Sequence, residues 1–394
     1  MTATKRWSML AISLIATLSA NVFINAIAFL IPAMNAQRGI GLASAGLLAS
    51  MPNFGTMVTL IGWGYLLDVI GERFVLATGL ALTAGASWAA AHAHSMVLMG
   101  VFLFLGGMAA ASTITASGRL VTGWFPPHQR ALAMGIRQTA QPLGIGVGAV
   151  VLPALAKHDF SAALIFPAVA CAVSAVGALV GVRDPARPPR AEADRTELAN
   201  PYRETGALWR IHLASALLML PQPVVLTFML VWATRDHGFS IAWAGALMGF
   251  SQLLGALART AAGRWADRIG SRMRPLRKIC VVTALVLFVL AVTDQIKSPI
   301  ALGAMVVALA ITGDNGLPFT TVPEIAGRYW SGRALGTQNT VERLVVAIAP
   351  PVFGAFITAA GYPVVFAVCG LFPLAALPFL PMVDRRPQCE PARL

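Results

Sequence analysis

Long hydrophobic runs alternate with short polar connections along this chain. A helix needs about 20 apolar residues to cross a hydrocarbon core of about 30 Å, and these runs reach that length. Because backbone groups in lipid must be hydrogen-bonded within their own segment, the runs predict membrane-spanning helices. The twelve predicted spans are about 7–33, 42–67, 73–92, 95–121, 131–156, 160–182, 209–234, 240–262, 277–295, 299–323, 334–359 and 362–383.

One long polar connection, 183–208, divides these spans six and six. It contains five arginines, five acidic residues and four prolines, which is typical of a solvated tether. The sequence therefore predicts an all-α integral membrane protein with three parts. These are an N-terminal six-helix bundle at 1–182, a linker at 183–208 and a C-terminal six-helix bundle at 209–394.

The basic residues predict the orientation of the spans. If the N-terminus is cytoplasmic, the outer connections hold only four basic residues, Arg38, Lys157, Arg235 and Lys297. The other 25 of the 29 basic residues then lie on the cytoplasmic side or within spans. Cytoplasmic loops carry an excess of Lys and Arg, so both termini are expected in the cytoplasm. The formal net charge of +13 then reflects membrane topology and not a nucleic-acid surface.

The composition excludes several classes of protein. Hydrophobic residues make up 57% of the chain and charged residues 11%, too few to cover a soluble globule. No phosphate-binding loop, Cys/His metal set or nucleophile constellation is present in the sequence. We therefore expect no cofactor, no resident metal and no enzymatic activity.

Two sequence matches indicate an internal duplication. Residues 64–73 (GYLLDVIGER) and 263–272 (GRWADRIGSR) share Gly, Asp, Ile, Gly and Arg in register, and each follows the second span of its half. The tripeptide Arg-Ala-Leu occurs at 130–132 and again at 333–335, where it opens the fifth span of each half. Parallel repeats of this kind bracket a cavity near the bilayer midplane in many transporters.

Twelve spans in two halves, with a G-x-x-x-D-x-x-G-x-R loop after the second span of each half, resemble the major facilitator superfamily. The resemblance covers essentially the whole chain. It implies a secondary active transporter that works by alternating access, usually driven by an ion gradient.

In this family the loop aspartate latches the two halves on the cytoplasmic side. The resemblance implies that Asp68 meets the start of the span at 334 and that Asp267 meets the start of the span at 131. Glycines would permit close approach and tight turns, and arginines would hold the aspartates or lipid phosphates. The expected latch residues are Gly64, Asp68, Gly71, Arg73, Arg119, Gly263, Asp267, Gly270 and Arg272.

Two features of the latch leave alternatives open. The first loop has Val69 and Glu72 where the family commonly has basic residues, so its own sequence offers fewer cations to its aspartate. Each loop is also compatible with a solvated turn whose charges only set topology. Arg119, at the end of the fourth span, fits the latch, proton coupling or a side chain that reaches the membrane surface equally well.

Ionisable residues deep within spans are functional hypotheses because burying them in lipid is costly. Arg137 lies two turns into the fifth span and is followed by Gln138 and Gln141. Glu342 and Arg343 lie equally deep in the eleventh span, where the repeat places Thr139 and Ala140 opposite them. The two halves are therefore not chemically symmetric, which suits an asymmetric substrate.

Arg259 precedes the second loop in the pattern R-x-x-x-G-x-x-x-D. This pattern is similar to the eighth span of monocarboxylate and oxalate transporters, where the arginine binds the substrate carboxylate, although it also occurs widely in the superfamily without that role. A guanidinium binds a carboxylate through two parallel hydrogen bonds. The expected substrate-binding residues are Asn25, Arg137, Gln138, Gln141, Gln252, Arg259 and Arg343.

Two acids are candidate proton carriers. Asp314 lies between glycines in the tenth span, and Glu342 lies in the eleventh. Burial disfavours the charged form of a carboxyl group, which suits proton uptake and release. A salt bridge to a nearby arginine such as Arg343 is the alternative role for either acid.

Together these features predict a proton-coupled secondary transporter of a small organic anion in the bacterial inner membrane. Its expected partners are the substrate, protons and membrane lipid; we expect a monomer and no contact with nucleic acid. A proton-driven exporter of lipophilic solutes is the first alternative. A receptor or assembly factor that keeps the fold without transport is the second.

Overall fold

The computed structural model describes residues 3–39, 42–156, 160–185, 198–204, 206–312 and 316–381. Asp314 and most of the predicted linker lie outside these residues. Within them the chain is helical and contains no β-strand.

The predicted spans are confirmed as helices. The first half contains α1 (Ala3–Arg38), α2 (Leu42–Ile70), α3 (Glu72–Ala91), α4 (Met96–Trp124), α5 (Pro127–Gln138), α6 (Ala140–Ala156) and α7 (Phe160–Gly181). The second half contains the short α9 (Pro201–Glu204), α10 (Ala207–Met219), α11 (Pro221–Val231), η2 (Trp232–Asp236), α12 (Ile241–Ile269), α13 (Met273–Gln295), α14 (Ile300–Ile311), α15 (Leu317–Ala326), α16 (Ser331–Ala360), α17 (Tyr362–Ala376) and η3 (Leu377–Phe379). Among the described residues, ten helical stretches are long and apolar enough to cross a membrane.

Proline explains two of the breaks within spans. A proline lacks the N–H that would bond to the carbonyl four residues earlier, and its ring clashes with that carbonyl. Pro142 lies four residues after Gln138, where α5 ends, and Pro223 lies four residues after Met219, where α10 ends. The fifth and seventh spans are therefore built from two helices each.

The chain divides into two compact units. Unit 1 comprises Met1–Phe125, Thr139–Ala199 and Gly327–Thr340, and unit 2 comprises Pro126–Gln138, Asn200–Ala326 and Val341–Leu394. The units follow the two sequence halves for most of their length. They differ from the halves in that α5 belongs to unit 2 and the first turns of α16 belong to unit 1.

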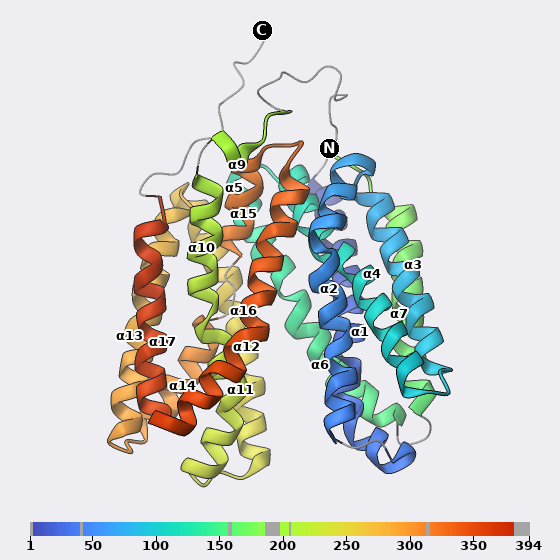
Figure 1. Ribbon diagram of the computed structural model, residues 1–394. Coiled ribbons are helices and arrows are strands. Elements are labelled where there is room, and N and C mark those ends of the chain that lie inside the picture. Colours follow the sequence, from blue (N-terminus) through green and yellow to red (C-terminus); the bar gives the residue numbers. More distant parts are fainter. Residues whose placement is uncertain are drawn as a thin grey trace. The chain divides into compact units, whose positions relative to one another are not determined.

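Small residues bring the helices of unit 1 into backbone contact. In Figure 1, α3 runs beside α4 and α7, and α2 runs beside α4. A side chain at Gly107 would overlap the backbone of Pro52, and one at Gly55 would overlap the backbone of α4 at Phe104. Lipid provides no hydrophobic drive for helix association, so such close packing is a main source of stability in membrane bundles.

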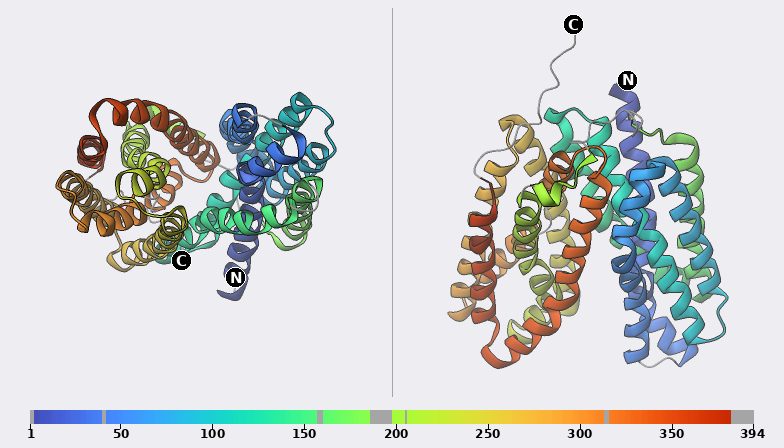
Figure 2. Two further views of the ribbon diagram at one scale, coloured as in Figure 1. Left: turned by 90° about the horizontal axis from the view of Figure 1, so that it is seen from below. Right: turned by 45° about the horizontal axis from the view of Figure 1, so that its top comes forward.

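Unit 2 has its own apolar core. Trp232, Met305 and Phe366 are buried there, and α13 packs along α17. Figure 2 shows the helices of each unit end-on in its left view. Large apolar side chains on outer helix faces are exposed, among them Val97, Val180 and Leu257 at 78%, 78% and 67%. Such faces suit contact with lipid tails.

Candidate latch and substrate site

Asp68, near the end of α2, caps the first turn of α16. Its side chain is fully buried. One carboxylate oxygen accepts from the backbone N–H of Gly332 at 2.9 Å, and the other accepts from that of Arg333 at 3.1 Å. The free N–H groups and positive dipole end of a helix N-terminus favour an anion at this place.

Two arginines neutralise the acids beside this helix end. Arg119 Nη1 lies 3.0 Å from Asp68 Oδ1, and Arg333 Nε donates to Asp68 Oδ2 at 3.1 Å. Arg119 Nε also lies 3.3 Å from the buried Glu72 Oε1. We call Asp68, Glu72, Arg119 and Arg333 the charge quartet; its two acids and two bases balance.

Asp267 binds the start of α5 in unit 2. Its carboxylate accepts from the N–H of Leu132 at 2.7 Å and of Ala131 at 3.2 Å. Arg272 Nη1 donates to Asp267 at 2.8 Å, and Arg272 Nη2 donates to the carbonyl of Pro127. Arg272 therefore joins the Asp267 carboxylate to the first residue of α5.

The structure places Arg73 away from Asp68. Its backbone N–H donates to Asp184 Oδ1 at 2.8 Å, and its Nε donates to the carbonyl of Leu179 at 2.6 Å. Gly71 has a φ of 92° and precedes α3, which starts at Glu72. Glu72, and not Arg73, contacts Arg119. Arg73 instead holds the carboxyl end of α7, where the helix dipole favours a cation.

Glycines allow the two helix pairs to touch. A side chain at Gly64 would overlap the backbone of Gly332, and a side chain at Gly263 would overlap the carbonyl of Ala131. Gly270 has a φ of 66° and ends α12 in the left-handed region, which glycine enters without steric cost. The expected close approach at Gly64 and Gly263 is thus present.

Replacing Gly64 by Ala is therefore expected to lower the unfolding free energy by about 1–3 kcal/mol, the cost of overpacking a tight contact. Gly62 on the same helix has nothing within 4 Å of the corresponding side-chain position. Its replacement by Ala is the matched control and should be neutral or stabilising, because Ala favours a helix over Gly. Denaturant titration of both variants checks this, and equal losses would contradict it.

Two buried arginines lie on helices in contact within unit 2. Arg137 is 4% exposed and Arg259 is 9% exposed. A side chain at Gly135 would lie 2.7 Å from the carbonyl of Arg259, so α5 and α12 meet backbone to backbone at this level. Arg137 is two residues beyond this contact, and its guanidinium lies 5.9 Å from the centroid of the Phe319 ring.

Gln138 belongs to the same cluster. Its Oε1 accepts from Arg137 Nη1 at 2.6 Å, and its side chain is 3.4 Å from the side-chain position of Gly316, just before α15. Arg137, Gln138 and Arg259, on α5 and α12, form what we call the arginine cluster.

The remaining predicted residues are more dispersed. Glu342 is buried and Arg343 is half-buried on α16, and Gln252 is half-buried on α12, all in unit 2. Asn25 and Gln141 belong to unit 1. Asn25 Nδ2 donates to the carbonyl of Asn21 at 2.8 Å, and Gln141 is exposed.

Some residues that form ionic contacts in the structure are not among those predicted from the sequence. Glu324 lies 3.2 Å from Arg130 and 3.8 Å from Arg272, and so extends the contacts around Asp267. Arg333 binds Asp68, and its signal was present in the repeated Arg-Ala-Leu tripeptide. Asp294, at the end of α13, accepts from Trp232 Nε1 at 3.0 Å and contacts His237 Nε2 at 2.9 Å. No sequence motif indicates this contact.

Comparison with known proteins agrees with this architecture. The family model for the Major Facilitator Superfamily matches residues 12–350. The MFS-type transporter Rv2994 of Mycobacterium tuberculosis is 56% identical over 378 residues, covering 96% of this chain and 85% of the relative. The probable galactarate/D-glucarate transporter GudP of Bacillus subtilis is 22% identical and covers 82% of this chain and 80% of its own.

The solved structures give the same fold. The proton:xylose symporter XylE superimposes with a TM-score of 0.75 at 15% identity, covering 96% of each chain. That likeness concerns the fold alone. With the family match over most of its length, the chain belongs to the major facilitator superfamily and is a multi-pass membrane transporter, not an enzyme.

Proposed function

We propose that this transporter moves a small organic anion bearing a carboxylate, coupled to protons, across the bacterial inner membrane. The observation that carries the proposal is the arginine cluster. Arg137 and Arg259 place two buried positive charges on touching helices, and ionisable groups at membrane depth mark substrate pathways. The relative GudP, named for transport of galactarate and D-glucarate, supports the same substrate class.

Within this proposal Arg259 is the substrate ligand and Arg137 provides a second positive charge. The planar fork of a guanidinium matches a carboxylate with two parallel hydrogen bonds, which a lysine ammonium lacks. Of the two candidate proton carriers, Glu342 is the one that lies among the described residues. It is buried and directly precedes Arg343 in the sequence. Alternating access with cytoplasmic termini completes the proposal, with Asp68 and Asp267 as the latch.

The test is uptake of radiolabelled D-glucarate and of a panel of monocarboxylates into proteoliposomes under an imposed proton gradient. Arg259→Gln should reduce uptake of the preferred acid by at least tenfold, because a hydrogen bond to a charged group contributes about 1.5–3 kcal/mol. Arg259→Lys should recover only part of it.

Arg268→Gln is the matched control, since Arg268 is exposed on the same helix and should leave uptake near wild type. Unchanged uptake in Arg259→Gln would refute the carboxylate proposal. Efflux of lipophilic cations, with no acid transported by the wild type, would favour the exporter instead.

A further inference from the structure

Two lateral cavities occupy corresponding places in the two units. One lies among α2, α3 and α4 and has a volume of about 680 Å³; the other lies among α12, α13 and α14 and has a volume of about 620 Å³. Four lining positions of the first recur in the second at the repeat spacing. They are Thr59, Gly62, Trp63 and Leu66 in the first and Ala258, Ala261, Ala262 and Trp265 in the second. We call them the N-terminal cavity and the C-terminal cavity.

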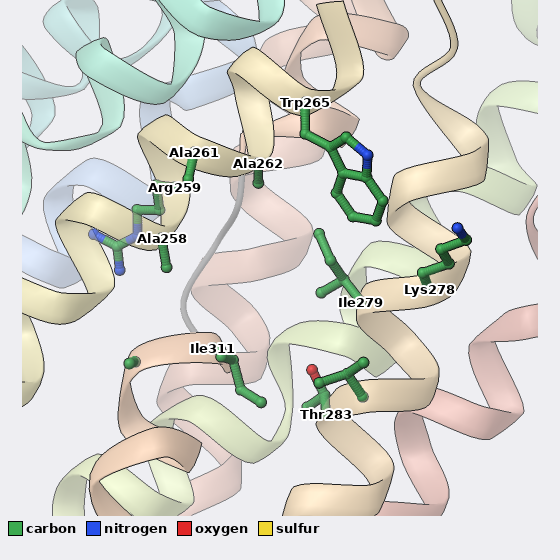
Figure 3. Close-up of a pocket in the computed structure, with 11 residues that line it drawn as sticks. Ala258, Arg259, Ala261, Ala262, Trp265, Lys278, Ile279, Thr283 and Ile311 are labelled. Atoms are coloured by element: carbon green, nitrogen blue, oxygen red, sulfur yellow. The ribbon is translucent and has the colours of Figure 1, made fainter. Parts of the chain in front are cut away.

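The two cavities differ in charge. The described residues that line the N-terminal cavity include no charged side chain, and its polar groups are satisfied: Thr59 and Trp63 both donate to the carbonyl of Met108, at 2.8 and 2.6 Å. The C-terminal cavity is lined by Lys278, whose ammonium lies 5.5 Å from the ring centroid of Trp265 (Figure 3). The residue equivalent to Lys278 in the first half is Gly79. The duplicated cavity therefore has this lysine in its second copy and no counterpart in its first.

A polar group without a partner lies deeper in the C-terminal cavity. Thr283 is 1% exposed, and its hydroxyl has no hydrogen-bond partner among the residues that the structure describes. Burying a hydroxyl without a hydrogen-bond partner costs free energy, so a bound ligand with a hydrogen-bond acceptor at this depth would be favoured. Thr283 follows Lys278 by five residues, which is about 7.5 Å along the helix.

Arg259 is the one residue of the arginine cluster that lines this cavity. In Figure 3 its guanidinium points away from Trp265 and Thr283. Val282, which lines the cavity, is 50% exposed, and the rest of the lining is mainly alanine and isoleucine. Its charged end is near the turn from α12 to α13, where exposed Arg264, Arg268 and Arg274 add positive potential.

We propose that the C-terminal cavity binds an anionic phospholipid. The headgroup phosphate binds Lys278 beside Trp265, an ester carbonyl accepts from the Thr283 hydroxyl, and an acyl chain lies along Ile279 and Ile311. Basic pockets between membrane helices recognise anionic lipids in this way, and tryptophan is favoured at the depth of the headgroups. This inference does not rest on the proposed substrate, since the guanidinium of Arg259 points away from Trp265 and Thr283 (Figure 3) and takes no part in binding the lipid.

Quenching of tryptophan by lipids with brominated acyl chains tests the proposal in the full-length protein. Proteoliposomes contain brominated phosphatidylglycerol or brominated phosphatidylcholine, and the signal of Trp265 is the difference between the wild type and Trp265→Phe. We expect phosphatidylglycerol to be preferred at Trp265 by about fivefold, the effect of one cation near an anionic headgroup. Lys278→Gln should abolish the preference and Lys278→Arg should retain it.

The N-terminal cavity provides the matched control. The signal of Trp63, obtained with Trp63→Phe, should show no preference between the two lipids. A preference that survives in Lys278→Gln, or that is equal at Trp63, would overturn the proposal. Loss of the preference on adding millimolar inorganic phosphate would also overturn it, because the site would then take a free anion and not a lipid.

Discussion

Arg119→Gln is expected to destabilise unit 1 by about 3–5 kcal/mol, the usual cost of leaving a buried charge without its partner. Arg119 lies within 3.3 Å of both Asp68 and Glu72, and the side chains of both acids are fully buried. Without Arg119, the charge quartet keeps two carboxylates and one cation. The free energy of unfolding, obtained by denaturant titration in a fixed detergent, measures the loss.

The charge quartet also predicts a rescue. Arg119→Gln combined with Glu72→Gln leaves Asp68 and Arg333 as one neutral pair, so the double variant should be more stable than Arg119→Gln alone. Glu72→Gln by itself leaves one excess positive charge and should cost less, because Arg119 keeps Asp68. If the double variant is no more stable than Arg119→Gln, the loss comes from the bonds of Arg119 to the carbonyls of Leu67 and Arg328, at 2.7 and 3.2 Å, and not from charge balance.

The helices and the positions of Asp68 and Asp267 could be predicted from sequence because their signals are local. Hydrophobic length defines a span, and the doubled loop motif places Asp68 and Asp267 at equivalent turns. The fifth and seventh spans break before Pro142 and Pro223, whose effect on the preceding turn is also a local matter. Such features need no knowledge of which helices touch.

The cations that hold Asp68 could not be assigned from its own loop. The motif suggested Arg73, five residues away, whereas the structure uses Arg119 from α4 and Arg333 from α16. These partners depend on helix packing, which Gly64 and Gly332 set by their close backbone contact. The loop that is poor in basic residues thus has a well-paired aspartate, because distant helices provide the missing charge.

Replacing Asp68 by Asn is expected to have a second large effect, on the exposure of the start of α16. A cysteine introduced there by Ser331→Cys should be labelled at least tenfold faster in Asp68→Asn than with Asp68 in place. Ser331, at the start of α16, is 4% exposed in the wild type. Asp68 fixes the next two residues of α16 through their N–H groups. Asn keeps the size of the side chain but loses the charge that binds Arg119 and the helix dipole.

The chain is well suited to this measurement. Its cysteines at 171, 280 and 369 are buried, and Cys389 is replaced by Ser so that Ser331→Cys supplies the reactive thiol. Asp267→Asn is the matched control, because the same chemical change then affects the other latch, which contacts α5. It should raise the labelling at position 331 less than Asp68→Asn does. No increase in Asp68→Asn would show that the carboxylate does not hold α16.

The side of the membrane from which a charged maleimide reaches the thiol introduced at position 331 tests the predicted orientation at the same time. The distribution of basic residues predicts that this turn is cytoplasmic, so labelling should occur in inside-out vesicles and not in intact cells. Equal labelling at this position in Asp68→Asn and Asp267→Asn would contradict the prediction, because neither carboxylate alone would then determine the exposure of α16.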